Sequence, residues 1–358
     1  MGAEPRLVPD KEGQSMARSI VGLDIGGANI KAAHVDGIAV NRPFPVWKDP
    51  ARLSEAITAV LECLPACEAL AVTMTAELAD CFQTKAEGVR HVLRHLERAA
   101  EGKPVVVWQT GAEFVEPCVA HQIPWLVAAA NWHALATFVG RLVPCGRSLL
   151  IDIGSTTTDI VPLRDGVPVP KGLTDCERLL AGELVYTGVR RTPVCAVVSA
   201  VPLGGQMCPV AAELFATTDD VYLLRGELPE RPDDCETANG RPATRPAARD
   251  RLARMVCCDR TELSAESIRA IADFVARSQE DQIQAAMDRV LGRLDADCES
   301  VLLSGSGEFL AQRLVERHPA LAGADRIRLA RCFSPAVAEA ACAFAVAKLA
   351  VERADGLL

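Results

Sequence analysis

The sequence has 358 residues, of which 49% are hydrophobic and 24% are charged, and its formal net charge is −9. This length exceeds what one simple core needs and indicates about two domains. The acidic balance argues against nucleic acid or an anionic membrane as the main partner. No apolar stretch is long enough to span a bilayer, and residues 1–17 form no secretory signal, so we expect a cytoplasmic protein. The 14 scattered cysteines indicate buried, reduced thiols.

Short β-like runs alternate with helical patterns through the first half of the chain. The run at 19–27 enters a turn, and residues 30–37 read as its hairpin partner. After this hairpin the pattern predicts a helix at 51–64, a strand at 69–75, an amphipathic helix at 85–100, a strand at 104–108 and one helix at 123–143. This alternation predicts an α/β architecture.

The second half of the chain is less regular. Its expected elements are a strand–turn–strand unit at 149–163, a loop-like then strand-like run at 184–200, a polar insertion at 226–249, helices at 251–257 and 264–294, a strand–glycine loop–helix unit at 300–317 and a final helix at 334–352. Ser334 is a suitable N-cap for that last helix, with Pro335 at its first position. We expect an N-terminal tail (1–17), a first domain (18–147), a second domain (148–333) and a C-terminal helix (334–358) that returns to the first domain.

One motif occurs twice. "GLDIGGANIKAAHVDG" begins at Gly22 and "LIDIGSTTTDIVPLRDG" at Leu150, and both read as strand, turn and strand. We interpret them as a duplicated unit with one copy in each domain. Glycine permits a tight turn with positive φ, and the backbone N–H groups of such turns suit phosphate oxygens. The candidate phosphate-binding residues are Asp24, Gly26, Gly27, Asn29 and Lys31 in the first copy and Gly154, Ser155, Thr156 and Thr157 in the second.

The two aspartates of these motifs predict a metal. Asp24 and Asp152 would face each other, and two carboxylates would repel a di- or triphosphate unless Mg²⁺ lay between them. A turn-capping role for both remains the alternative. A third motif, "LLSGSGEF", contributes Gly305, Ser306 and Gly307 between a strand and a helix, where anions or a nucleotide are favoured.

Further candidates lie outside these motifs. Thr75, Glu77 and Lys85 follow a strand end, and Glu77 is a candidate general base or else an exposed acid at a helix start. Asn131 interrupts an apolar helix, where a substrate or a core hydrogen bond would satisfy it. Arg190 and Arg191 could bind diphosphate or a carboxylate, or lie on the surface. Asp159 orients the second turn or acts as a base.

The order DIGG, DIGSTTTD and SGSGE followed by a C-terminal helix resembles the actin/Hsp70/sugar-kinase superfamily, and within it the hydantoinase/oxoprolinase-like group. The segments "TMTAELADCFQTKAEGV" (73–89), "AAANWHALAT" (128–137) and "YTGVRRTPVCA" (186–196) resemble a family of the tetrahydromethanopterin-linked C1-transfer pathway. The resemblance covers about residues 18–350. It implies an actin-like ATPase (ribonuclease H-like) fold of duplicated domains with a central cleft.

The resemblance also implies a reaction. The archaeal members of that family are methanofuran-biosynthesis synthases, in which a phenol oxygen displaces diphosphate from a furanyl-methyl carbon. The expectation is therefore a Mg²⁺-dependent transferase with a phosphorylated substrate and a phenolic acceptor, with Asp152, Glu77 and Asp159 as its catalytic residues and Thr75, Lys85, Asn131, Arg190 and Arg191 as its substrate-binding residues. ATP is not the favoured ligand, and a homodimer stays open. The alternatives are an ATP-dependent kinase or hydrolase of the same superfamily and a non-catalytic, nucleotide-switched binding module.

Overall fold

The computed structural model describes residues 19–353, so the expected tail at 1–17 lies outside the described residues. A first sheet, sheet A, has the strand order β3-β2-β1-β4-β5-β6. Strands β1 and β2 form the predicted antiparallel hairpin, while β4 runs parallel to both β1 and β5. The bounds are β1 (Ile20–Ile25), β2 (Asn29–His34), β3 (Ala39–Pro43), β4 (Ala69–Met74), β5 (Val105–Gln109) and β6 (Glu113–Val115).

Sheet B repeats this plan in the second half of the chain. Its strand order is β10-β8-β7-β13-β14, with β9 paired to β8. Here β7 and β8 form the antiparallel hairpin, and β13 runs parallel to both β7 and β14. The bounds are β7 (Arg147–Ile153), β8 (Thr158–Arg164), β9 (Val167–Pro168), β10 (Leu184–Val185), β13 (Ser300–Ser304) and β14 (Asp325–Arg328). Two sheets that share one hairpin-first topology confirm the predicted duplicated, actin-like α/β fold.

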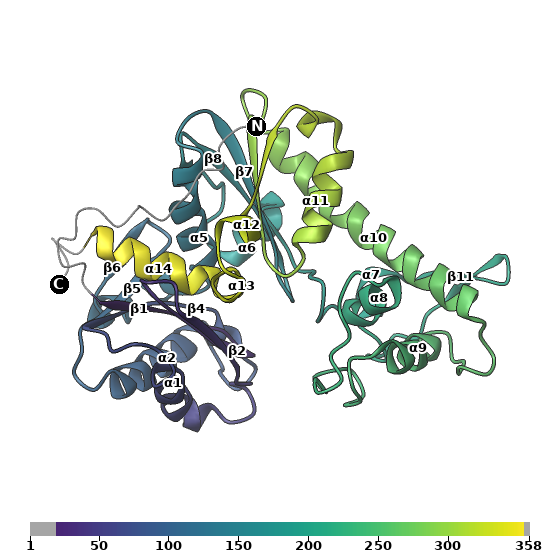
Figure 1. The fold of residues 1–358 in the computed structure, drawn as a ribbon, viewed down its shortest axis with the longest axis horizontal. Helices are drawn as coiled ribbons and strands as arrows, with labels where there is room; N and C mark the ends of the chain where they lie inside the picture. The colour runs from purple at the N-terminus through teal and green to yellow at the C-terminus, as the bar shows by residue number, and fades with distance from the viewer. Residues whose placement is uncertain (1–18, 354–358) are drawn as a thin grey trace.

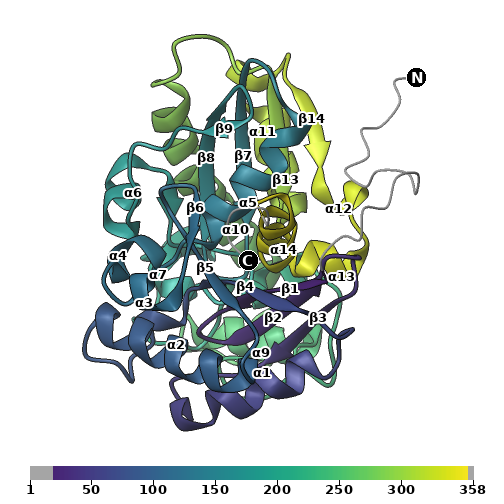
Figure 2. The ribbon, with the colours of Figure 1, turned by 90° about the vertical axis from the view of Figure 1, so that its left-hand side faces the viewer.

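Helices separate the two sheets and cover their outer faces (Figures 1 and 2). Helices α1 (Leu53–Leu61) and α2 (Lys85–Ala100) cover one face of sheet A, and α10 (Ala265–Leu291) and α11 (Glu308–Arg317) cover one face of sheet B. Between the sheets lie α5 (Asn131–Val139) and α14 (Ala341–Glu352), whose buried apolar side chains join both sheets in one core. Sheet A with α1 and α2 is called the first lobe below, and sheet B with α10 and α11 the second lobe.

The C-terminal helix packs against β1 through a glycine. A Cβ atom at Gly22 would lie only 1.9 Å from the carbonyl oxygen of Ala343, so the backbones of β1 and α14 meet without a side chain between them. The sequence predicted one helix at 334–352, but the structure has α13 (Pro335–Glu339) and then α14. Ser334 caps α13 by accepting a hydrogen bond from the Val337 N–H, and Pro335 follows it as expected.

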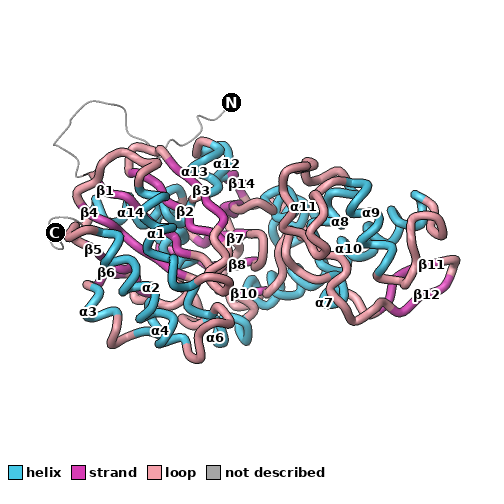
Figure 3. Tube along the Cα trace, turned by 90° about the horizontal axis from the view of Figure 1, so that it is seen from below, coloured by secondary structure: helices cyan, strands magenta, loops and turns pink. Residues whose placement is uncertain are grey.

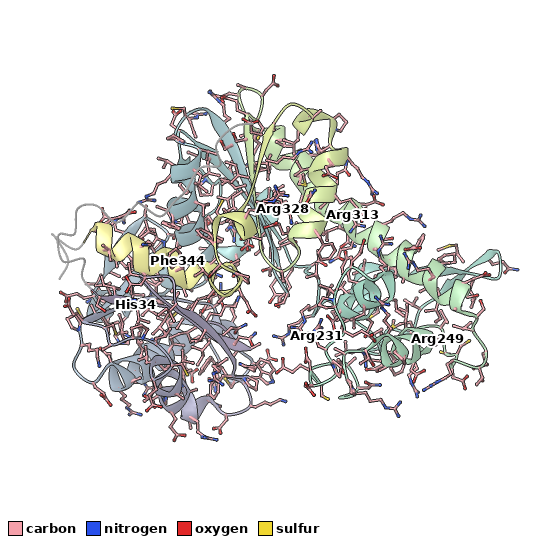
Figure 4. The ribbon with its side chains drawn as sticks, in the orientation of Figure 1. His34, Arg231, Arg249, Arg313, Arg328 and Phe344 are labelled. Atoms are coloured by element: carbon pink, nitrogen blue, oxygen red, sulfur yellow. The ribbon has the colours of Figure 1, made fainter. Side chains whose placement is uncertain are left out.

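A helical extension projects from the second lobe alongside α10 (Figure 3). It consists of α7 (Val194–Val197), the hairpin β11 (Ala200–Leu203) and β12 (Gln206–Pro209), α8 (Thr218–Arg225) and α9 (Arg245–Arg254). The strand-like prediction for part of 184–200 is therefore wrong at α7. The polar insertion is held in place by ion pairs, because Arg231 bonds both Asp219 (2.6 Å) and Asp234 (3.0 Å). Arg231 lies on the side of the extension that faces the first lobe (Figure 4).

Two other expectations fail. The single helix predicted at 123–143 is broken into α4 (Pro124–Val127) and α5, because Ala128 pairs with Met74 of β4 and Ala129 has a φ of 48°. The cysteines within residues 19–353 are free thiols, but only Cys298 and Cys342 are buried. None of the helices in 19–353 has the length and apolarity to cross a membrane. The remaining helices are α3 (Pro117–Ala120), α6 (Asp175–Ala181) and α12 (Leu329–Cys332), with short 3-10 turns at Pro50–Arg52, Ala76–Leu78, Gly140–Leu142 and Pro319–Leu321.

Candidate functional site

The two DIG motifs form turns of the same geometry. In the first, the Gly26 N–H donates to the Asn29 carbonyl oxygen (2.9 Å), and in the second the Gly154 N–H donates to that of Thr157 (2.8 Å). The turn residues are partly exposed and available to a ligand. The hydroxyl groups of Ser155, Thr156 and Thr157 lie on the second turn, whereas buried Thr158 donates its hydroxyl to the Thr187 carbonyl oxygen (2.8 Å). The second turn therefore offers three hydroxyl groups.

In each hairpin, the aspartate of the DIG motif lies opposite a charged residue on the neighbouring strand. Asp24 pairs across the β1–β2 ladder with Lys31, and Asp152 pairs across the β7–β8 ladder with Asp159. The duplicated position thus holds a cation in the first lobe and a carboxylate in the second. Asp24 is buried, and its Oδ1 atom has no hydrogen-bond partner among the described residues. A buried carboxylate oxygen without a partner is costly and points to a ligand.

Charged groups from both lobes act on the Asp152 carboxylate. Burial raises the pKa of Asp152 to about 6, the Asp159 and Asp24 carboxylates add to the rise, and Lys31 and a hydrogen bond from Ser304 oppose it. Burial also raises the pKa of Asp24, while Lys31 lowers it. The pKa values of both carboxylates are raised, and a hard cation such as Mg²⁺ would neutralise their charge. No group of three or more metal-ligating side chains occurs within residues 19–353, so protein ligands would be few.

The glycine loop after β13 abuts the second turn. A Cβ atom at Gly305 would lie 2.2 Å from the Ile153 carbonyl oxygen and 2.5 Å from Oδ1 of Asp152. Gly307 donates its N–H to the same carbonyl oxygen (2.8 Å), whereas Ser306 is exposed. Close packing therefore requires both glycines whether or not a nucleotide binds. Gly305 has a positive φ (90°), whereas Gly26, Gly27 and Gly154 do not, so the expected positive φ in the two DIG turns is wrong.

Residues 187–191 support the second turn from behind. The N–H groups of Arg190 and Arg191 both donate to the Ser155 carbonyl oxygen, and Gly188 leaves no room for a side chain against the turn. The Arg190 side chain forms ion pairs with Asp219 and Asp234, so the two predicted arginines differ in whether they are free to bind a ligand. Arg191 is exposed and forms no ion pair with any residue in 19–353.

Arg191 makes a cation–π contact with Trp47, which lies in the loop between β3 and α1. Its guanidinium carbon lies 5.3 Å from the ring centre of Trp47. The adjacent Val46 donates its N–H to the Gly27 carbonyl oxygen (2.9 Å), so Trp47 is fixed beside the first turn as Arg191 is fixed beside the second. Trp47 is 38% exposed, which leaves ring surface for a ligand. Sequence reasoning missed this tryptophan, which lies in a loop without a motif.

Thr75, Glu77 and Lys85 follow β4, as predicted. Thr75 donates its N–H to the Ile25 carbonyl oxygen (2.9 Å) and lies next to Gly26 of the first turn. Glu77 is 1% exposed, and neither carboxylate oxygen has a hydrogen-bond partner among the described residues. Burial raises the pKa of Glu77 to about 8, and Asp175 also raises it, while Lys85 and nearby backbone amides lower it. Glu77 is thus not the exposed helix-start acid of the alternative interpretation.

Asp159 is held by a buried arginine that sequence reasoning missed. Arg178 is 1% exposed and donates to Oδ1 of Asp159 (2.7 Å), and its guanidinium lies 3.8 Å above the ring of Trp132. Arg178 follows the capping box of Thr174 and Glu177 on α6, a local signal that predicts the helix but not this contact. The arrangement favours an orienting role for Asp159 over that of a free base.

Asp175 on the same helix extends the polar row towards Glu77. Burial raises its pKa, Lys85 and Arg178 lower it, and Asp159 raises it. Asn131 does not interrupt a helix but is the partly buried first residue of α5. The acids are thus coupled electrostatically, because Asp24 and Asp159 raise the pKa of Asp152, Asp159 raises that of Asp175, and Asp175 raises that of Glu77.

Comparisons with known proteins agree with this fold. A model of the hydantoinase/oxoprolinase family matches residues 68–353. The (4-{4-[2-(gamma-L-glutamylamino)ethyl]phenoxymethyl}furan-2-yl)methanamine synthase of Methanocaldococcus jannaschii is 30% identical over 339 residues, which are 94% of this chain and 98% of the relative. The synthase of the same name from Methanococcus vannielii is 35% identical over 127 residues, or 35% of this chain and 57% of the relative. Nucleotide-free acetone carboxylase has a similar fold, with a TM-score of 0.56, 11% identity, and coverage of 92% of this chain and 70% of that one.

Proposed function

The chain belongs to the hydantoinase/oxoprolinase family, and from this premise we propose that it is an enzyme that forms an aryl–alkyl ether. Its electrophilic substrate would be an aminomethylfuran-methyl diphosphate, and its nucleophile a phenol of the tyramine or tyrosine type. The observation that carries this proposal is the 30% identity to a named synthase over almost the whole of both chains. The kinase or hydrolase alternative has less support, because neither of the synthases reported above is named for such an activity.

The proposed reaction assigns the twin turns to the leaving group. The phenol oxygen forms a bond to the furanyl-methyl carbon, and the bond from that carbon to the diphosphate oxygen breaks with its electron pair. Backbone N–H groups of the turns and the hydroxyls of Ser155, Thr156 and Thr157 would bind the departing diphosphate. Asp24 and Asp152 would hold Mg²⁺, which neutralises charge on the diphosphate when it is bound.

The phenol must lose its proton as it attacks. Its pKa is near 10, so a base with a raised pKa is suited to the transfer. Glu77 fits this role, because it is buried, has no hydrogen-bond partner among the described residues and has a pKa raised to about 8. Arg178 fixes Asp159, and Trp47 with Arg191 would contact the aromatic part of a substrate between the turns.

The direct test is product formation. Purified protein would be incubated with Mg²⁺, the furan diphosphate and γ-glutamyltyramine or tyramine, and the ether and released diphosphate would be measured by mass spectrometry. We expect one diphosphate released for each ether formed, with a loss of about 10²–10⁴-fold in kcat for Glu77→Gln. Glu97→Gln, an exposed acid on α2, is the matched control.

A binding experiment separates this proposal from the ATP-dependent alternative. Calorimetric titration with Mg²⁺ plus pyrophosphate would be run beside Mg²⁺ plus a non-hydrolysable ATP analogue. Tight pyrophosphate binding that is lost in Asp152→Ala, together with weak binding of the analogue, is the expected result. Strong binding of the ATP analogue with weak binding of pyrophosphate would reject the ether synthase in favour of a kinase or ATPase.

A further inference from the structure

A cavity lies away from the twin turns, beside β8, β9 and the C-terminal end of α10, which meets β8 near the top of Figure 1. Its volume is about 270 Å³. This is near the lower end for pockets that bind small molecules. The lining combines an apolar floor of Pro162, Leu163, Val169, Val290 and Leu294 with the charged residues Arg147, Arg164, Lys171, Arg293 and Glu183.

The negative charges at this cavity are already satisfied. The carboxylate of Glu183 is 1% exposed and accepts hydrogen bonds from the N–H groups of Lys171 (2.8 Å) and Gly172 (3.1 Å) and from the guanidinium of Arg293 (2.8 Å). It thus has no capacity left for a cationic ligand.

Most of the positive charges at this cavity have partners. Asp295 is shared by Arg147 (2.7 Å) and Arg164 (2.9 Å). Arg293 pairs with Glu183, and Asp165 and Glu299 also lie near Arg147 outside the lining. The side chain of Lys171 is exposed and has no hydrogen bond or ion pair with any other residue in 19–353. Lys171 is therefore the cation most available to a ligand, and Arg164, whose side chain is 52% exposed, would share its guanidinium between Asp295 and the ligand.

We propose that this cavity binds a small phosphate monoester, with the phosphate held by Arg164 and Lys171 and an apolar group against the floor. Lys171 supplies an ammonium group that has no other partner within residues 19–353, and arginine presents paired donors to phosphate oxygens. The apolar floor selects an ester over inorganic phosphate, because a free ion would leave that surface in contact with water.

The cavity is connected to the twin turns through Glu183, which immediately precedes β10. The backbone carbonyl oxygen of Glu183 accepts a hydrogen bond from Arg178 (2.9 Å), and the same guanidinium nitrogen donates to Asp159 (2.7 Å). Asp159 is the ladder partner of Asp152. A phosphate that draws the Arg293 side chain away from Glu183 would disturb the contact between Glu183 and Arg178. Binding in the cavity would then change the affinity of the turns for diphosphate, and diphosphate would change the affinity of the cavity by the same factor.

The test uses the full chain and phenyl phosphate as the probe. Its binding would be measured calorimetrically for the wild type, for the double variant Arg164→Gln/Lys171→Gln and for the control Arg90→Gln/Arg331→Gln, which removes two exposed, unpaired cations elsewhere. We expect affinity to fall about tenfold or more in the cavity variant and to stay within about twofold in the control. Equal losses in both variants, or no binding at millimolar probe, would overturn the proposal.

Two further titrations separate this cavity from the twin turns. Phenyl phosphate should bind Thr156→Val as it binds the wild type, and Mg²⁺ plus pyrophosphate should still bind the cavity variant. Loss of phenyl phosphate binding in Thr156→Val, with retention in the cavity variant, would place the probe at the turns and overturn the proposal. Inorganic phosphate that binds as tightly as phenyl phosphate would overturn the role of the apolar floor. None of these results depends on whether the ether is formed.

Discussion

At the scale of single residues, Glu77 is a carboxylic acid whose charge has no partner. Its pKa is raised by burial from 4.5 to about 8, so the folded state keeps a proton that the unfolded chain releases above pH 4.5. The free energy of unfolding therefore falls as pH rises from about 4.5 to 8, with no further loss from this group above that. A buried acid that destabilises the fold at neutral pH indicates a functional demand at this position.

Glu77→Gln should remove that pH dependence. The amide cannot ionise, so the variant should gain stability over the wild type as pH rises, reaching on the order of 1–3 kcal/mol near pH 8. Urea denaturation at several pH values between 5 and 9 measures this difference. Parallel stability profiles for the two proteins would show that Glu77 ionises normally, and Glu97→Gln should leave the profile unchanged.

The four consecutive hydroxyl residues after Gly154 divide into two functions. Thr156 is partly exposed on the turn, whereas Thr158 is buried and bonds the Thr187 carbonyl oxygen. Thr156→Val should weaken Mg²⁺-pyrophosphate binding by about tenfold and leave the melting temperature unchanged. Thr158→Val should lower stability by about 1–2 kcal/mol and leave pyrophosphate affinity unchanged. Calorimetry and thermal denaturation of both variants decide this, and the reverse assignment would remove Thr156 from the diphosphate site.

At the scale of elements, the packing of α14 on β1 depends on one glycine. Gly22→Ala would place a methyl group 1.9 Å from the Ala343 carbonyl oxygen, so the helix would have to move off the strand that carries Asp24. We expect a loss of at least about 2 kcal/mol in unfolding free energy and weaker pyrophosphate binding. Gly323→Ala, where a Cβ atom meets nothing within 4 Å, is the control for the effect of alanine itself. A Gly22 variant as stable as this control would contradict the close contact.

Local signals predicted the elements, and long-range contacts account for the failures. The helix at 85–100 matches its predicted bounds, because its apolar periodicity and its Thr84 cap are both local. The predicted helix at 123–143 breaks because Ala128 pairs with Met74, about fifty residues away, and three alanines give no sign of it. The twin turns were predictable, because the Asp-Ile-Gly motif occurs in both of them. Arg178 was not, because its contacts to Asp159 and Trp132 exist only in the folded chain.

At the scale of the whole molecule, duplication has given the two lobes different charges at one position. Lys31 and Asp159 occupy equivalent places opposite Asp24 and Asp152, so the first turn carries a balanced pair and the second a pair of carboxylates. Arg178 offsets this imbalance from within the second lobe. A cation is therefore attracted more strongly to Asp152 at the second turn than to Asp24 at the first. The diphosphate would then bridge from that cation to the first turn.

The contact between Trp47 and Arg191 should report this bridging. Arg191 is tied to the second turn by its own backbone N–H, and Trp47 is tied to the first turn through the N–H of the adjacent Val46. A ligand that draws the turns together should therefore change how the guanidinium lies over the indole ring. Mg²⁺ plus pyrophosphate should therefore change tryptophan fluorescence in the wild type but not in Trp47→Phe. Trp108 and Trp132 are buried and Trp125 is exposed, and all three remain in that variant as internal controls.

Arg191→Gln should weaken pyrophosphate binding by several-fold, because an unpaired guanidinium beside the second turn is lost. A fluorescence change that persists in Trp47→Phe would show that the ligand acts elsewhere, and unchanged affinity in Arg191→Gln would restrict this arginine to its contact with the ring.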